Sequence, residues 1–356
     1  MRKISYICWV ASIIVINSGC GNNHLTSQDY EEPIFGQEIQ TDIKLLNEDF
    51  IFSPGKIGVV DTLIVYSGRT DIADKAFHLF SKISGEYITS FGNIGRARGE
   101  VSQASRGFSL DKERGILYVH DAAMGKTLSY SLSKVLAGEM DYVNEIHLPG
   151  FGYNIYSFYF LYLKDSFLAG YTGTDRFLVC SETDTIASSD YYPELAEKKR
   201  YKAIEQQYYF NAGSMAAKPD GDMFVHATTC GCIMEIWKNE GSTIHPCAVK
   251  RFFKPNYLTI DRDQDAPQVQ INDNDPMGIS SMSCTNQYIY AKYNNTPGYN
   301  TNKIAVFDWD GNPCVMYITN NNIATFDVDE DDTVYALAFE NEDSPLKLIA
   351  IQLTRP

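Results

Sequence analysis

Short apolar runs separated by polar turns recur along this chain about every 45 to 65 residues. In each repeat, a strand-like run leads through a polar or glycine-containing turn to a second run, and a longer polar loop leads to a third. A single four-stranded unit cannot bury both of its faces, so repetition at this period is typical of propellers and solenoids. The pattern predicts six copies, whose second runs begin at Asp61, Lys112, Leu163, Pro219, Thr285 and Asp329.

The run that precedes each second strand is rich in small residues. Strands that converge on a propeller axis are crowded, which favours Gly, Ala, Ser or Thr at these positions. We therefore expect innermost strands over residues 107–110, 212–217, 278–284 and 323–328, and outer strands over 86–91, 142–148, 244–253 and 313–319.

The sixth copy ends at Leu353 with no outer strand left to supply, whereas an N-terminal run over 39–52 precedes the first inner strand near Ile57. Pairing this N-terminal strand with the last blade would close the ring and remove an open sheet edge. The predicted fold class is therefore all-β: a six-bladed β-propeller, with the ring closed by an N-terminal strand that completes the last blade.

The first residues have the order of an export signal. A basic start is followed by an apolar stretch over 4–16, which is short for a membrane span, and then by small residues. The segment from Asn17 to Cys20 resembles the lipobox of bacterial lipoproteins, in which the cysteine is acylated after cleavage, although Asn17 replaces the usual aliphatic residue. An ordinary signal peptide with a chance cysteine is the alternative.

These features divide the chain into three parts. Residues 1–19 are interpreted as a lipoprotein signal peptide, residues 20–40 as a flexible tether that follows the lipidated Cys20, and residues 41–356 as one propeller domain. The formal net charge is −15, which argues against nucleic acid and anionic lipid as partners. We expect contact with the membrane through the lipid anchor only. We expect most of the six cysteines beyond Cys20 to be buried free thiols.

Loop lengths predict a binding face. The connections between outer and next inner strands, and those between second and third strands, open on one end of a propeller, and here both sets are long. Binding residues concentrate in long loops on a rigid scaffold. The segment 193–207 also predicts a short helix over this end.

Charged residues in these loops are the candidate site. Two arginines beside a carboxylate could bind an anionic group, or could form an internal ion-pair latch that orders the loop. Another long loop carries an acidic run at 261–265, where a weak cation site is an alternative to solvated carboxylates. The candidate ligand or partner face comprises Arg96, Arg98, Glu100, Arg106 and Asp263.

Metal and catalytic motifs give no assignment. Cys230 and Cys232 are expected at one end of a strand and Cys247 at the other, too far apart for shared zinc coordination. The acidic run from Asp327 to Asp331 lacks the glycine and glutamate of a calcium loop, which predicts solvated turn carboxylates. The chain has no nucleophile elbow, zinc-protease motif or phosphate-binding glycine loop. We expect no metal and no cofactor, and no catalytic residue is identified.

Together with the ending at Cys20, two segments carry a family resemblance: Phe91, Gly92, Gly95, Gly99 and Glu100 after the first blade, and Gln207, Tyr209 to Pro219 and Gly221 entering the fourth. The chain resembles TolB-like six-bladed β-propeller lipoproteins, a family mostly of unassigned function. Ala97 and Arg98 stand where that family usually has glycine and proline. The resemblance implies a fold and a cell-envelope compartment, with no catalytic residues.

The sequence favours a non-enzymatic binding or scaffolding lipoprotein, anchored in the outer membrane and facing the periplasm. We expect the long-loop face to bind a protein partner, or an extracytoplasmic peptide or glycan. The alternative is a propeller hydrolase or lyase, in which carboxylates such as Glu100 and Asp263 perform acid–base chemistry at the channel mouth. A third possibility is a structural envelope protein whose channel is filled by side chains.

Overall fold

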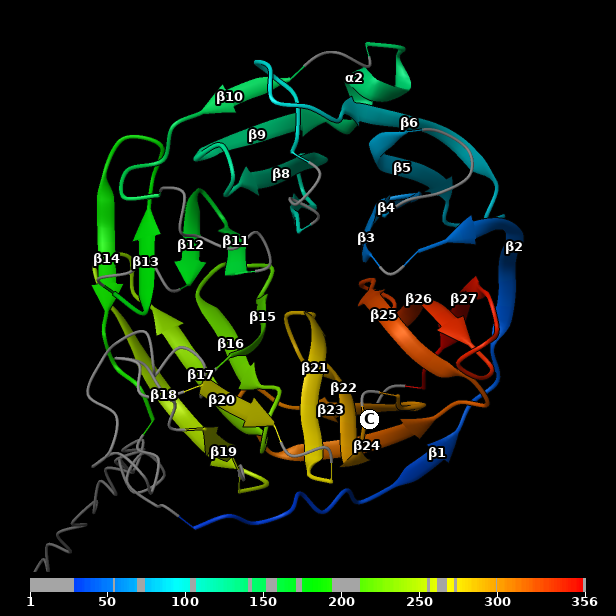
Figure 1. Cartoon of the computed structure of the whole chain (residues 1–356), viewed down its shortest axis with the longest axis vertical. Coiled ribbons are helices and arrows are strands. Elements are labelled where there is room, and N and C mark those ends of the chain that lie inside the picture. The colour runs from blue at the N-terminus through cyan, green and yellow to red at the C-terminus, as the bar shows by residue number, and fades with distance from the viewer. Residues whose placement is uncertain are drawn as a thin grey trace, which may run out of the picture.

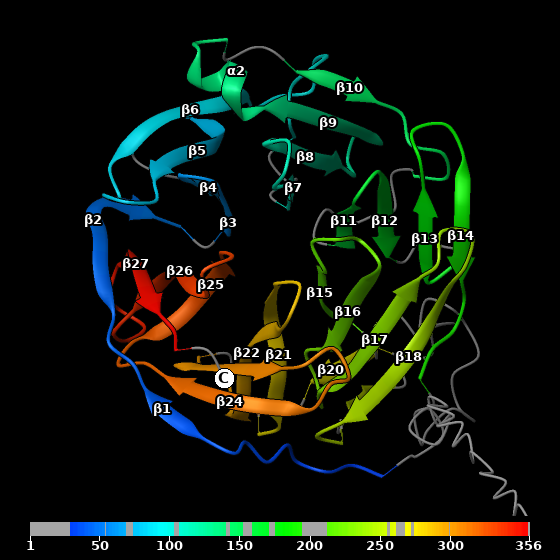
Figure 2. The same cartoon turned by 180° about the vertical axis from the view of Figure 1, so that it is seen from behind.

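Six antiparallel sheets stand as blades around a central axis (Figure 1), and the reverse view shows the same ring (Figure 2). This computed structural model describes residues 29–53, 55–68, 74–102, 107–139, 143–151, 159–170, 175–193, 212–254, 257–260, 268–271, 274–298 and 300–354. The predicted all-β six-bladed propeller is confirmed.

The first three blades follow one another in sequence, each from the innermost to the outermost strand. Blade 1 contains β3 (Lys56–Val60), β4 (Leu63–Ser67), β5 (Lys75–Ser81) and β6 (Tyr87–Asn93). Blade 2 contains β7 (Ser109–Asp111), β8 (Ile116–Asp121), β9 (Lys126–Ser131) and β10 (Asn144–Ile146). Blade 3 contains β11 (Phe160–Leu163), β12 (Ser166–Gly170), β13 (Phe177–Cys180) and β14 (Thr185–Ser189).

The last three blades repeat this order, and the sixth takes its outer strand from the N-terminal part of the chain. Blade 4 contains β15 (Gly213–Ala217), β16 (Met223–Thr228), β17 (Ile233–Asn239) and β18 (Ile244–Arg251). Blade 5 contains β21 (Pro276–Cys284), β22 (Ile289–Pro297), β23 (Lys303–Phe307) and β24 (Pro313–Ile318). Blade 6 contains β25 (Asn322–Val328), β26 (Thr333–Phe339), β27 (Leu346–Gln352) and β2 (Lys44–Phe52).

Strand β2 closes the ring as the sequence predicted. It pairs antiparallel with β27, with Lys44 opposite Ala350 and Leu45 opposite Ile349. Register shifts on either side of Asn47 bend this strand, and the Asn47 side chain donates a hydrogen bond to the carbonyl of Gly85 in blade 1 (3.0 Å). The closing strand therefore contacts both the last blade and the first.

Three strands and one short helix were not predicted. Strand β1 (Glu38–Gln40) adds a fifth strand to blade 5 by pairing parallel with β24, and it covers the outer edge of that blade. Strands β19 (Tyr257–Ile260) and β20 (Gln268–Ile271) form a hairpin in the connection between blades 4 and 5, where the sequence predicts a loop. A short helix, α2 (Leu132–Leu136), lies between β9 and β10. The helix expected over 193–207 lies almost entirely outside the described residues.

Alternation of side chains along a strand explains why the second runs read as continuously apolar. All five residues of β4 are buried. Leu63 and Val65 pack in a cluster with residues of blade 2, whereas Ile64 and Tyr66 pack in a cluster with residues of blade 6. A central strand of a blade is therefore buried on both faces, as the two-residue period of a strand requires.

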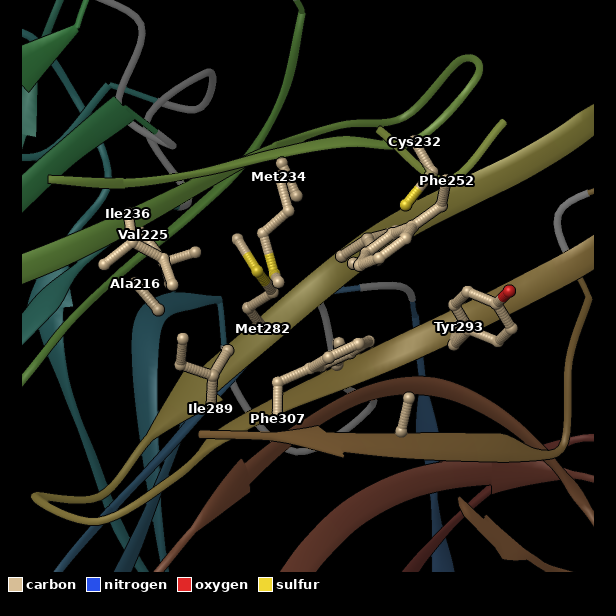
Figure 3. Close-up of a cluster of buried hydrophobic side chains, with 14 of the residues drawn as sticks. Ala216, Val225, Cys232, Met234, Ile236, Phe252, Met282, Ile289, Tyr293 and Phe307 are labelled. Carbon is tan, nitrogen blue, oxygen red and sulfur yellow. The ribbon is translucent and has the colours of Figure 1, made fainter. Parts of the chain in front are cut away.

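The core is divided among the six interfaces between neighbouring blades, and each interface contains one cluster of buried apolar side chains. Figure 3 shows the cluster between blades 4 and 5, where Met234 and Ile236 of β17 face Met282 of β21 and Phe307 of β23. Every blade thus depends on both of its neighbours for burial of its apolar surface.

Steric crowding near the axis explains why the innermost strands contain small residues. A Cβ atom on Gly58 of β3 would lie 2.7 Å from the Phe108 ring and 2.6 Å from Leu110 Cδ1, so a larger residue would displace blade 2. The predicted innermost strands are confirmed at β7, β15, β21 and β25.

Cysteines beyond Cys20 are free in the structure, as expected, although only Cys180, Cys232 and Cys284 are buried. Within the residues placed by the structure, no helix has the length and hydropathy needed to cross a membrane.

Candidate functional site

A cavity of about 630 Å³ lies on the axis of the ring. It is lined by residues of the innermost strands of all six blades, including Ile57 of β3, Leu161 of β11 and Met282 of β21. Its volume is within the range of small-molecule sites in proteins. The channel of this propeller is therefore not filled by side chains along its whole length.

This cavity lies at the end of the ring opposite to the face predicted from loop length. We call the end formed by the turns between first and second strands the turn end, and the opposite end the loop end. The first-to-second turns contain between two and five residues. Residues of these turns in blades 2 to 6 line the cavity, among them Lys112, Lys164, Pro219, Asn286 and Glu330. The cavity therefore extends to the turn end.

Asp327, near the end of β25, is the most densely hydrogen-bonded side chain of the cavity wall. Its Oδ2 atom accepts hydrogen bonds from the backbone N–H of Val59 (2.7 Å) and from the Nζ of Lys112 (3.0 Å), and its Oδ1 atom accepts one from the hydroxyl of Ser283. Lys112 also donates to the carbonyl of Val328 (3.0 Å). Asp327 thus connects blades 1, 2, 5 and 6 at the axis.

The environment of Asp327 keeps it ionised. Burial opposes ionisation, but the charge of Lys112 and the hydrogen bonds from Ser283 and Val59 outweigh burial and hold the pKa of this carboxyl below its usual value. The prediction of solvated turn carboxylates is therefore wrong for Asp327 and for the buried Asp329, and holds for the exposed Asp331. Asp327 belongs to the innermost strand, which the acidic pattern alone did not indicate.

Lys56 opens β3 and lies away from the first-to-second turns, deep in the cavity. Its Nζ donates a hydrogen bond to the carbonyl of Phe108 (2.6 Å) and lies 5.4 Å from the centre of the Phe108 ring. Burial lowers the pKa of Lys56 to about 8; Asp327 opposes this shift and Lys112 adds to it. Lys56 forms no ion pair with any described residue.

Ion pairs neutralise part of the cavity mouth. Arg114 binds Asp111 and the hydroxyl of Tyr162, and its guanidinium lies 5.5 Å from the Tyr162 ring centre. Lys218 lies 2.8 Å from an oxygen of Asp220. The first pair lies in the turn region of blade 2 and the second in that of blade 4, and the contact between Arg114 and Tyr162 joins blade 2 to blade 3.

The predicted loop-end residues do not line this cavity. Arg96 and Arg98 are exposed, in the connection between β6 and β7, and neither forms an ion pair with another described residue. Glu100 is partly buried and accepts a hydrogen bond from the backbone N–H of Ala97 (2.8 Å). The structure therefore does not show the arginine–glutamate latch among these three residues. Arg106, Asp263 and Cys20 lie outside the described residues.

Local geometry explains the glycines and glutamate of this connection. A Cβ atom on Gly95 would lie 1.9 Å from Oε2 of Glu100, and Gly99 has a φ of 76°. The carbonyl of Ala97 accepts a hydrogen bond from Lys126 of blade 2 (3.0 Å). The segment that carries the family resemblance thus fixes the crossing from blade 1 to blade 2.

A fully buried charged group lies between blades 3 and 4, and the sequence did not indicate it. Arg176 donates two hydrogen bonds of 2.7 Å to the carboxylate of Glu235 on β17, and its Nη2 atom lies 3.2 Å from Nδ1 of His226. Burial would raise the pKa of Glu235, but Arg176 and the hydrogen bond with His226 lower it to about 2. The three side chains are fully buried, away from the cavity lining, which makes a role in stability the simplest account.

No group of His, Cys, Asp and Glu side chains that could hold a metal ion occurs within the described part of the chain. Sequence reasoning also missed Lys56, Lys112 and Ser283. For Lys56 and Lys112, the available signal was a charged residue at the start of an innermost strand or directly after one, whereas Ser283 is a small residue of the kind expected there and gave no signal.

The match to a family model agrees with the six-bladed ring. The model of the TolB-like 6-blade propeller-like family matches residues 34–331. No curated protein matches the sequence. One similar solved structure is a hydrazine synthase from Kuenenia stuttgartiensis, with 9% sequence identity, coverage of 85% of this chain and 96% of that chain, and a TM-score of 0.46. A DUF4221 family member from Bacteroides vulgatus has 8% identity, coverage of 89% of this chain and 99% of that chain, and a TM-score of 0.49. A functionally unknown protein from Desulfotomaculum acetoxidans has 8% identity, coverage of 74% of this chain and 74% of that chain, and a TM-score of 0.41.

Proposed function

Because the chain belongs to the TolB-like 6-blade propeller-like family, we propose that it is a non-enzymatic binding protein whose ligand occupies the axial channel. The supporting observation is the cavity of about 630 Å³ that all six blades line. Its wall contains apolar residues together with many charged and polar residues, and the innermost strands of the six blades hold these groups in place.

Binding is favoured over the hydrolase or lyase alternative because of the hydrogen bonds of Asp327. Both of its oxygens already accept hydrogen bonds, and its lowered pKa makes it a poor proton donor at neutral pH. Glu100, one of the two carboxylates suggested for acid–base chemistry, is absent from the cavity lining.

Ala217, the last residue of β15, offers a direct test because it lines the cavity. Ala217→Trp would fill part of the cavity with an indole ring. We expect ligands found by a thermal-shift screen of metabolites and oligosaccharides to lose their stabilising effect in this variant. The matched control, Arg96→Ala/Arg98→Ala/Glu100→Gln, changes the loop end only and should keep the response. Ligands that bind Ala217→Trp and wild type equally would contradict the proposal.

The loop end supports a second proposal, the docking of a protein, peptide or glycan. The observation in its favour is the pair of exposed arginines, Arg96 and Arg98, that pair with no described carboxylate. We further propose that the protein is a lipoprotein attached through Cys20 to the periplasmic side of the outer membrane. Labelling with a radioactive fatty acid, lost in Cys20→Ala, would test the attachment.

A further inference from the structure

The deep part of the cavity contains more positive than negative charge. Lys112 and Asp327 form an ion pair of 3.0 Å, and Lys56 is close enough to both charges for them to change its proton affinity. Asp327 forms its ion pair with Lys112, whereas Lys56 has no ion-pair partner among the described residues. One positive charge is therefore left uncompensated.

Hydrogen-bonding capacity points in the same direction. An ammonium group has three N–H donors. Lys56 uses one of them, on the carbonyl of Phe108, and Lys112 uses two, on Asp327 and on the carbonyl of Val328. Asp327 accepts hydrogen bonds at both oxygens. Donors therefore remain available in this part of the cavity, whereas the carboxylate is already occupied.

The remaining charges of the lining lie nearer to the mouth. Asp111 and Asp220 are paired with Arg114 and Lys218. Glu113, Asp165, Glu330 and Lys164 belong to the first-to-second turns at the turn end, where negative charges outnumber positive ones. Lys112 also begins in such a turn, but its Nζ contacts Asp327 and Val328 of β25. The excess positive charge is thus local to the interior, where Lys56 begins β3.

We propose that the interior of the cavity is an oxyanion site, in which Lys56 and Lys112 bind a carboxylate or phosphate group of a small molecule. Asp327 forms an ion pair with Lys112 and thereby compensates one of the two lysine charges. This inference rests on the proposed function, because it names the chemistry of the ligand that the channel takes.

Three sugars of similar size test the preference for an anion: glucuronate, glucose 6-phosphate and uncharged glucose. Isothermal titration of the full-length protein should show at least one anionic sugar binding about tenfold or more tightly than glucose. The preferred anionic sugar also tells whether a carboxylate or a phosphate is the better ligand. Equal binding of glucose, or no binding of either anion at about 10 mM, would overturn the proposal.

Variants at the two charged positions separate charge from folding. Lys56→Met should weaken anion binding about tenfold or more, whereas Lys56→Arg should retain most of it. Asp327→Asn removes the compensating charge and should strengthen anion binding about threefold or more. A loss of affinity in folded Asp327→Asn, or unchanged affinity in Lys56→Met, would contradict the assignment. Neutral ligands that Ala217→Trp excludes would leave the proposed function intact while this inference fails.

Discussion

Buried Glu235 shows how strongly one carboxylate can depend on its partners. Arg176 meets it with two hydrogen bonds of 2.7 Å, and His226 lies 3.3 Å from the same carboxylate. Removing one member of such a pair leaves a buried charge without compensation, which costs far more than replacing both members by apolar side chains. The two kinds of substitution therefore distinguish the pair's contribution from that of packing.

We predict that Glu235→Gln lowers the free energy of unfolding by about 3 kcal/mol, because Arg176 then lies in a dry interface without a carboxylate. The double variant Arg176→Met/Glu235→Leu should lose less than the sum of its two single variants. Urea unfolding, followed by tryptophan fluorescence, measures all of them. Additive losses would show that the two side chains act independently.

Acid should weaken the same interface. The folded-state pKa of Glu235, about 2, is below its reference value of 4.5. A lowered carboxyl pKa contributes stability that is fully present above pH 4.5 and is lost as the pH falls toward 2. We expect the free energy of unfolding of wild type to fall more steeply over this range than that of Arg176→Met/Glu235→Leu. Parallel pH profiles would contradict this expectation.

Lys56 makes anion binding depend on pH near neutrality. Its pKa of about 8 means that the ammonium form loses its proton between pH 7 and pH 9, while Asp327 and Lys112 are the charged groups that act on it. We predict that the affinity for the preferred anionic sugar falls about tenfold from pH 7 to pH 9. Lys56→Arg should give a much flatter profile in the same titrations, because a guanidinium stays charged throughout this range.

Residue patterns in the sequence could indicate these sites only in part. The sequence identified Gly95 and Gly99 only as part of a family resemblance, and the structure shows their role in the connection between blades 1 and 2. Asp327 was read as a solvated turn residue, because a local acidic run does not reveal that Lys112, which is 215 residues away, lies beside it. Charge pairs that join distant blades have no local signature, so the cavity could not be predicted from the sequence.

At the scale of elements, the period of the apolar pattern was sufficient to predict all six blades. The reason is physical: a central strand is buried on both faces, so its sequence is largely apolar, as in β4 and β26. Strand β1 was missed because it contains only three residues, of which Ile39 alone packs against the core. The β19–β20 hairpin was missed because the segment that connects blades 4 and 5 is mostly polar in sequence.

Two truncations separate the roles of the N-terminal strands. Removal of residues 1–43 takes away β1 but leaves β2, so we predict a folded protein whose melting temperature is lower by a few degrees. Removal of residues 1–52 also takes away β2, which exposes the edge of β27 and opens the ring between blades 6 and 1. The longer truncation should aggregate or unfold without cooperativity in calorimetry. A cooperative transition of similar temperature in both truncations would show that closure by β2 is dispensable.

At the scale of the molecule, the propeller has two candidate binding surfaces, one at each end of the ring. The turn end carries the cavity, with residues of both charges around its entrance and Lys56 in its interior. The loop end carries Arg96 and Arg98 on a connection that crosses from blade 1 to blade 2. The six closely packed interfaces between blades extend from one end of the ring to the other and hold the two ends in a fixed arrangement. We therefore expect a substitution at one end to leave binding at the other end unchanged.

Crosslinking in intact cell envelopes tests this independence. We predict that a protein partner captured by wild type is lost in Arg96→Ala/Arg98→Ala/Glu100→Ala, and that this variant binds the small ligand of the cavity with unchanged affinity. Ala217→Trp should show the opposite pattern, retaining the captured partner while losing the small ligand. If both variants lost both activities although their melting temperatures matched wild type, the two ends would be coupled through the ring. The channel ligand would then act as an effector of partner binding, with reciprocal effects on the two affinities.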